Sequence, residues 1–201
     1  MILLDLDGVC ADFLGHVLNL TGHTEQEMLD CIKNNPETHP YDLLGELVNK
    51  RRSEFWDWME GLGDFFETIP PLPWFKKLWD GLEEVDKVYF LTSGPYPGSF
   101  IGKATWVEKH LGKYDSNNKR MSRRCIICSS EAKHALAKPG NVLIDDTEKN
   151  IEEWTSKGAP AYFFPSLQFW SRHPTDDEIN QAIEFAREHN DVHPGIRTNY
   201  I

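Results

Sequence analysis

The chain has 201 residues, 40% hydrophobic and 26% charged, a composition that suits one packed core with a modest insertion and not a disordered protein. Its formal net charge of −11 repels polyanions at long range, which argues against extended DNA or RNA as a partner. No apolar run approaches the roughly 20 residues that span a bilayer, and Met1–Leu4 is too short for a signal-peptide core, so we expect a cytoplasmic protein with no membrane partner.

Short apolar segments alternate with helical patterns along the chain. The predicted strands are Ile2–Leu6, Val88–Leu91, Cys125–Cys128, Val142–Ile144 and Ala161–Phe164. The predicted helices are Lys103–Leu111, Ser130–Ala137, Thr147–Lys157 and a closing helix over Thr175–Glu188. Apolar strands that alternate with helices are typical of a parallel sheet covered by helices on both faces, so the fold class is predicted to be α/β.

One long stretch interrupts this alternation. Between Gly15 and Pro73 the sequence has helical patterns and no convincing strand. The clearest pattern is a stripe at three- and four-residue steps, apolar except for one arginine and formed by Tyr41, Leu44, Val48, Arg51, Phe55, Trp58, Met59 and Leu62. Residues 16–71 are therefore predicted to be a helical insertion, and residues 1–15 and 72–201 the α/β core.

Two of the four cysteines form a C-x-x-C pair, Cys125 and Cys128. A zinc site would need a second pair or suitably spaced histidines, and the sequence offers neither. Because the pair falls within a predicted strand, we interpret both residues as core thiols and not as a metal or redox site.

Carboxylates gather where the first and fourth predicted strands end. Asp5 and Asp7 are two residues apart, so on extended backbone their side chains project the same way. Asp145 and Asp146 close the fourth strand at the same edge of the sheet. Such a cluster of like charges is costly without a cation, and a few hard oxygen ligands suit Mg²⁺ better than zinc.

Neutral donors and lysines accompany these carboxylates. Thr92 and Ser93 end the second predicted strand, and Lys103, Lys133 and Lys138 follow as candidates to neutralise a phosphoryl group. Each feature alone has an ordinary interpretation, such as an acidic turn, a helix cap or a solvated lysine. Their occurrence together, each near the carboxyl end of a strand, favours a phosphoryl-transfer site.

The same segments resemble the haloacid dehalogenase superfamily. The matching motifs are Asp5-Leu6-Asp7-Gly8-Val9, Leu91-Thr92-Ser93 and Leu143-Ile144-Asp145-Asp146. The longer segments Asp5–Phe13, Leu91–Pro95, Lys103–Gly112 and Leu143–Asp146 together resemble the 5'(3')-deoxyribonucleotidases. This resemblance implies a Rossmann-like core and a small helical cap inserted after the first strand.

The resemblance also implies roles at the acidic positions. Asp5 would be the nucleophile that forms an aspartyl-phosphate, and Asp7 would be the general acid and then the general base. Dehalogenases of the superfamily lack the second carboxylate, so Asp7 favours a phosphatase. Asp5, the backbone carbonyl of Asp7 and Asp146 would hold Mg²⁺, with Asp145 in support or exchanging roles with Asp146.

Further roles concern the substrate. By resemblance, Thr92, Ser93, Lys133 and Lys103 would bind the phosphoryl group, with Lys133 the nearest match to the family's phosphate-binding lysine. An aromatic residue after the first motif stacks on the base in this family, and Phe13 matches it. The cap aromatics Tyr41, Phe55, Trp56 and Trp58 either pack the cap on the core or line the cleft; Trp58 is the second candidate for substrate binding.

The predicted function is therefore a Mg²⁺-dependent phosphomonoesterase that acts on nucleoside monophosphates, with deoxyribonucleotides preferred by resemblance. One alternative is a phosphatase for another small phosphate ester, and another is a 3'-end phosphatase on nucleic acid, which the acidic charge disfavours. A catalytically silent binding module of the same fold is a third, although it would be expected to lack some of the acidic residues that this chain retains. The sequence indicates no oligomeric state.

Overall fold

A five-stranded parallel sheet forms the centre of the computed structural model, which describes residues 1–167 and 172–190. In spatial order the strands are β3 (Cys125–Cys128), β2 (Val88–Ser93), β1 (Ile2–Leu4), β4 (Val142–Asp145) and β5 (Ala161–Phe163). Leu3 of β1 pairs with Tyr89 on one side and Leu143 on the other. The predicted strands and the α/β fold class are confirmed.

Alternate residues of the strands belong to two separate hydrophobic cores. Ile2 and Leu4 are buried in the larger core, and Leu3 between them is buried in the smaller one, against Leu143 and Trp154. Side chains of a strand alternate between faces, so an all-apolar strand must be covered on both sides. The uninterrupted apolar run before Asp5 therefore places the first strand in the middle of the sheet.

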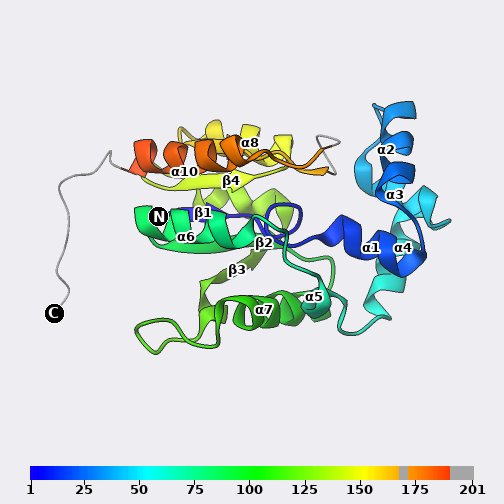
Figure 1. Ribbon diagram of the computed structural model, residues 1–201, viewed down its shortest axis with the longest axis horizontal. Helices are drawn as coiled ribbons and strands as arrows, with labels where there is room; N and C mark the ends of the chain where they lie inside the picture. The colour runs from blue at the N-terminus through cyan, green and yellow to red at the C-terminus, as the bar shows by residue number, and fades with distance from the viewer. Residues whose placement is uncertain (168–171, 191–201) are drawn as a thin grey trace.

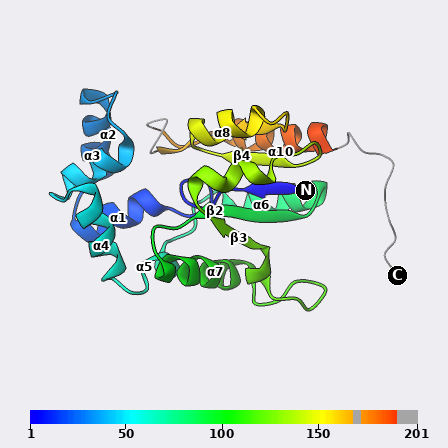
Figure 2. The ribbon, with the colours of Figure 1, turned by 180° about the vertical axis from the view of Figure 1, so that it is seen from behind.

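Helices cover both faces of the sheet, as Figures 1 and 2 show from opposite sides. Helices α6 (Phe75–Val85) and α10 (Asp176–Asn190) pack together on one face, whereas α8 (Glu148–Thr155) and the short 3₁₀ helix η2 (Ser130–Leu136) lie on the other. Helix α6 has no counterpart among the predicted helices.

The predicted helices differ from the observed ones mainly at their ends. α7 (Pro97–Leu111) begins six residues before the predicted start at Lys103, because Pro97 occupies its first turn, where a missing N–H costs nothing. The segment predicted as a helix over Ser130–Ala137 forms the tighter 3₁₀ helix η2.

Five helices lie between β1 and α6, and the first four stand to one side of the sheet in Figure 1. They are α1 (Phe13–Thr21), α2 (Glu25–Asn34), α3 (Pro40–Leu47), α4 (Arg52–Glu60) and α5 (Phe65–Thr68), which packs against α7. A cap domain over residues 16–71 stays a prediction, as does a core domain that runs to residue 201, because residues 191–201 lie outside the described ones.

The long stripe from Tyr41 to Leu62 spans two helices and not one. The chain leaves α3 at Val48, where Asn49 takes a positive φ of 56° and Lys50 donates to the Gly45 carbonyl at 2.8 Å. Asparagine tolerates this left-handed conformation better than most residues, which permits the break.

The two connections between these helices and the sheet are paired with each other. The Asp12 amide donates to the Pro70 carbonyl at 2.9 Å, and the Leu72 amide donates to the Cys10 carbonyl at 2.8 Å. The buried indole of Trp74 adds a hydrogen bond to the Val9 carbonyl at 2.9 Å. These bonds fix the first helices beyond the carboxyl ends of the strands.

All four cysteines are free. Cys125 packs on the larger core and Cys128 on the smaller one, so the pair points to opposite faces of the edge strand β3. Burial raises the pKa of Cys125 to about 12, which keeps the thiol protonated. Both residues are only partly buried, and their placement agrees with structural thiols. Separately, no helix within the described ranges has the length and apolar character needed to cross a membrane.

Candidate active site

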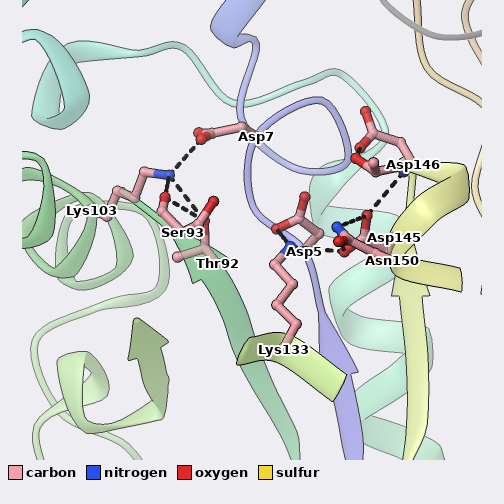
Figure 3. Close-up of polar contacts among 10 residues, drawn as sticks. Asp5, Asp7, Thr92, Ser93, Lys103, Lys133, Asp145, Asp146 and Asn150 are labelled. Atoms are coloured by element: carbon pink, nitrogen blue, oxygen red, sulfur yellow. Dashed lines mark hydrogen bonds and ion pairs between the residues drawn. The ribbon is translucent and has the colours of Figure 1, made fainter. Parts of the chain in front are cut away.

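Three carboxylates meet at the carboxyl end of the sheet (Figure 3). Asp5 directly follows β1, Asp145 is the last residue of β4, and Asp146 comes next. One oxygen from each of these buried side chains lies within 4.8 Å of the other two. Since β1 and β4 are hydrogen-bonded parallel neighbours, their ends carry Asp5 and the Asp145–Asp146 pair to the same place.

Asp145 is fully engaged by the protein. Its carboxylate accepts hydrogen bonds from Lys133 at 2.8 Å, from the Thr147 amide at 2.9 Å and from Asn150 at 3.0 Å. Asp146 differs, because its buried Oδ2 atom has no hydrogen-bond partner in the part of the chain that the structure describes. A buried carboxylate oxygen without a partner is costly, so Asp146 is better suited than Asp145 to bind a cation.

The backbone at Gly8 makes room for Asp146. Gly8 has a φ of 79°, which favours glycine, and a Cβ atom there would lie 2.2 Å from Asp146 Oδ2. The glycine of the first motif is therefore required both for the turn and for the close approach of this carboxylate.

Lys133 joins two of the carboxylates. It is only 3% exposed, and its Nζ atom lies 2.8 Å from Asp5 Oδ1 and 2.8 Å from Asp145 Oδ2. Burial alone would lower the pKa of Lys133, but the charges of Asp145 and Asp5 outweigh burial and raise that pKa above its usual value. Lys133 therefore remains a cation at neutral pH.

The positive charge of Lys133 does not fully offset the negative charges of Asp5, Asp145 and Asp146. Burial raises the pKa of Asp5 to about 7, with Lys133 acting in the opposite direction and Asp145 adding to the rise. Burial, followed by the charges of Asp5 and Asp145, also raises the pKa of Asp146 well above its usual value. A bound cation would relieve this repulsion, and the residues present suit a hard divalent ion.

Lys103 is buried on the other side of the site, 1% exposed. Its Nζ atom lies 2.5 Å from Asp7 Oδ2 and 2.9 Å from Thr92 Oγ1, and it also donates to the Ser93 carbonyl. The third candidate lysine, Lys138, is exposed and does not line the cavity at the site. The structure thus brings two of the three candidate lysines to the carboxylates.

A cavity of about 520 Å³ lies above these groups. Asp5, Asp7 and Asp146 line it from the sheet edge. From α3, α4 and the residue that caps α3, the cavity is lined by His39, Tyr41, Arg52 and Trp56. Thr92, Ser93, Lys103, Lys133, Thr147, Lys149 and Asn150 complete much of the wall.

The structure does not bring Phe13 or Trp58 to this cavity. Phe13 is 1% exposed and packs edge-on against Tyr41, with ring centroids 5.8 Å apart. Trp58 packs on Phe55 at 5.9 Å, with the Lys50 ammonium 5.7 Å from its ring. Phe13 is the buried first residue of α1, and Trp58 lies on the same side of α4 as the buried Phe55. Both side chains therefore pack among the helices and not against the cavity.

The aromatic side chains that do line the cavity are Tyr41 and Trp56, whose ring centroids are 5.5 Å apart. Trp56 lies off the apolar stripe of its helix, and this position in the sequence indicates that its side chain does not face the buried side of α4. Tyr41 and Trp56 were among the cap aromatics that the sequence offered for the cleft, whereas sequence reasoning missed Arg52 and Asn150, which binds Asp145 from the first turn of α8.

Solved structures with the same fold are haloacid dehalogenase-like proteins. A hydrolase of this family from Streptococcus pneumoniae, SP0104, is 13% identical, covers 90% of this chain and 89% of its own, and has a TM-score of 0.51. A hydrolase of the family from Xanthomonas campestris is 10% identical over 94% of this chain and 93% of its own, also with a TM-score of 0.51. These similarities confirm the fold.

Sequence comparison is more specific. None of the curated proteins matches the chain. The family model described as "5' nucleotidase, deoxy (Pyrimidine), cytosolic type C protein" matches residues 1–184, which is most of the chain and includes every motif residue discussed above. The chain therefore belongs to this 5' nucleotidase family of haloacid dehalogenase-like fold, and it is a phosphoric monoester hydrolase.

Proposed function

We propose that the protein is a Mg²⁺-dependent phosphatase of nucleoside monophosphates, with deoxyribonucleotides preferred, and that Asp5 carries the phosphoryl group during the reaction. The observation that carries this proposal is a single cavity that is charged at one end and aromatic at the other. Buried carboxylates and two lysines lie at the sheet edge, and Tyr41 and Trp56 line the same cavity from the helices beyond it.

Asp5, Asp146 and the backbone carbonyl of Asp7 would hold the metal ion. Support comes from the unpartnered Asp146 Oδ2 atom and from the mutual approach of the Asp5 and Asp146 oxygens. When bound, Mg²⁺ supplies positive charge that stabilises the phosphoryl oxygens during transfer. Asp145 would keep the supporting role that its hydrogen bonds to Lys133, Thr147 and Asn150 indicate.

In the first step a carboxylate oxygen of Asp5 attacks the phosphorus atom, and the bond from phosphorus to the ester oxygen breaks. Asp7 gives its proton to that leaving oxygen, so the nucleoside departs as a neutral alcohol. Lys133 would bind a phosphoryl oxygen and balance its charge, with Thr92 and Ser93 as further donors.

In the second step a water molecule attacks the phosphorus atom of the aspartyl-phosphate. Asp7 takes the proton from this water, the bond between phosphorus and Asp5 breaks, and inorganic phosphate is released with Asp5 restored. One residue can serve as acid and then as base because the second step returns the proton that it lost in the first.

The cavity supports a small substrate. Its volume of about 520 Å³ is typical of sites for small molecules, and a flat aromatic base could stack on Tyr41 or Trp56. Arg52 and His39 line the same cavity and add polar contacts at that end. The net charge of −11 does not favour a nucleic-acid chain as substrate.

Phosphate release from deoxy- and ribonucleoside monophosphates, phosphorylated at the 5' or 3' position, tests the proposal. Sugar phosphates without a base belong in the same panel, and each assay is run with Mg²⁺, with EDTA and with Asp5→Asn. We expect turnover in the presence of Mg²⁺ and none in EDTA. Turnover should be highest on deoxynucleotides and absent in Asp5→Asn. Faster turnover of a sugar phosphate would overturn the substrate assignment, and Mg²⁺ binding without turnover of any ester would overturn the enzymatic proposal.

A further inference from the structure

The two buried lysines of the site contact different carboxylates (Figure 3). Lys133 hydrogen-bonds the proposed nucleophile Asp5, whereas Lys103 contacts the proposed acid–base residue Asp7. Figure 3 shows Lys103 and Asp7 meeting on one side of the cluster and Lys133 rising beneath Asp5 on the other. The two ammonium groups therefore have separate tasks in the structure, although the sequence suggested one phosphate-binding role for both.

The ammonium of Lys103 has no hydrogen-bonding capacity to spare. It carries three N–H donors, and it has three acceptors: Asp7 Oδ2, Thr92 Oγ1 and the Ser93 carbonyl. The ring of Phe66, from α5, packs over it with its centroid 5.0 Å from Nζ. A buried cation with every donor used and an aromatic ring beside it is held in one orientation.

Asp7 is held by one oxygen only. Oδ2 is 2.5 Å from Lys103, whereas Oδ1 is buried and has no hydrogen-bond partner in the described ranges of the chain. The side chain is 16% exposed and lines the cavity. Lys103 thus fixes the direction of the carboxylate at the edge of the cavity.

We propose that Lys103 is a positioning residue for Asp7, holding its carboxylate so that it can give a proton to the leaving oxygen and then take one from water. This inference rests on the proposed acid–base role of Asp7. Proton transfer is effective only at hydrogen-bond distance and in the right orientation, so a freely rotating Asp7 would be a poorer acid and base. Because Lys103 would act through Asp7, its removal should cost little once Asp7 is disabled.

A double-mutant cycle tests this dependence. The variants are Lys103→Met, Asp7→Asn and the two combined, and the substrate is p-nitrophenyl phosphate, whose good leaving group keeps residual rates measurable. We expect Lys103→Met alone to lower kcat by about 10- to 100-fold, because Asp7 still acts as the base of the second step with this substrate and acid–base catalysis contributes about 100- to 10,000-fold. In the Asp7→Asn background the same substitution should change kcat by less than about 3-fold, the non-additivity of residues that act as a unit.

Lys133→Met is the matched control, since it also removes a buried ammonium but one that contacts Asp5 and Asp145. Lys133→Met should lower kcat by the same factor in the Asp7→Asn background as in wild type. A second measurement is the ratio of kcat for dUMP to kcat for p-nitrophenyl phosphate. Lys103→Met should lower this ratio, as Asp7→Asn does, because only the nucleotide needs its leaving oxygen protonated.

The inference is overturned if Lys103→Met lowers kcat as much in the Asp7→Asn background as in wild type. It is also overturned if Lys103→Met weakens inhibition by inorganic phosphate and leaves the ratio of the two kcat values unchanged, because that result would indicate a phosphate-binding role. Failure of the proposed function would look different, with wild type inactive on both substrates or Asp5→Asn active. Near-ultraviolet circular dichroism checks the fold of each variant. If Lys103→Met does not fold, Lys103→Gln, whose amide keeps two donors, takes its place in the cycle.

Discussion

Lys133 Nζ lies 2.8 Å from Asp5 Oδ1, although the two residues are 128 positions apart in the chain. The same ammonium lies 2.8 Å from Asp145 Oδ2, and all three side chains are buried. One cation thus offsets two carboxylates that converge from neighbouring strands. This contact joins the stability of the sheet edge to the chemistry proposed there.

Replacement of Lys133 by methionine should therefore harm both properties. Without a metal, loss of the cation leaves two buried carboxylates unpaired, so we expect the free energy of unfolding in EDTA to fall by about 3 to 5 kcal/mol. With Mg²⁺, kcat should fall at least about 100-fold, as for loss of one donor to a transition-state charge. Urea denaturation and phosphate release measure the two effects. Lys138→Met, at an exposed position outside the cavity, is the control and should match wild type.

Much of this arrangement could be predicted because it depends on local patterns. Apolar runs defined the strands, and the residue after each run had to lie at the carboxyl edge of a parallel sheet. These patterns are sufficient to place Asp5, Asp145 and Asp146 together at that edge. The order of the strands in the sheet then determined that Asp5 and Asp145 would be neighbours.

Contacts set by packing between distant segments could not be predicted in the same way. The break at Asn49 turns α4 so that Trp56 faces the cavity and Trp58 does not, and no periodicity within one helix shows this. The choice of Asp7 as the partner of Lys103 depends likewise on how α7 packs against β3 and α5. For the same reason, resemblance gave Phe13 a substrate role that its buried position beside Tyr41 does not support.

Asp145 and Asp146 should respond differently to conversion to asparagine. Asp146→Asn removes the negative charge, and Oδ2 has no hydrogen bond to lose, so we expect the substitution to abolish the thermal stabilisation given by Mg²⁺ without lowering stability in EDTA. Asp145→Asn disturbs bonds to Lys133, Thr147 and Asn150, so stability in EDTA should fall while a Mg²⁺-induced shift remains. Thermal denaturation across a Mg²⁺ titration measures both, since a ligand at 100 times its Kd adds about 2.7 kcal/mol. Equal Mg²⁺ responses in the two variants would contradict this division.

Trp56→Ala tests the proposed site for the base. Stacking on an aromatic side chain is worth about 1 to 3 kcal/mol per base, so KM for dUMP should rise about 10-fold or more, whereas ribose 5-phosphate, which has no base, should be unaffected. Trp58→Ala is the matched control, because Trp58 belongs to the same helix and packs outside the cavity. Steady-state kinetics on both substrates decides the question. If Trp58→Ala raises KM for dUMP more than Trp56→Ala does, the base lies elsewhere.

Glu178 links acid stability to the start of α10. Its carboxylate accepts two hydrogen bonds from Arg172, at 2.6 and 2.8 Å, and one from the Thr175 amide at 2.8 Å. The Arg172 bonds first, and the Thr175 amide next, lower the pKa of Glu178 from 4.5 to about 2. The unfolded state therefore binds the proton more readily than the folded state, so these bonds stabilise the fold above pH 4.5 and lose their effect as pH falls towards 2.

Glu178→Gln should consequently lower stability by about 1 kcal/mol at pH 7, the usual cost of losing a helix cap, with a difference from wild type that shrinks between pH 4.5 and 2. Urea denaturation of both proteins at pH 7, 5 and 3 measures this difference, and titrations common to both proteins cancel in it. Glu184→Gln removes the same charge from an exposed position on the same helix, where Glu184 pairs with Arg187, and should cost less than about 0.5 kcal/mol. A Glu178→Gln deficit as large at pH 3 as at pH 7 would show that the lost contacts act through packing and not through the ionised carboxylate.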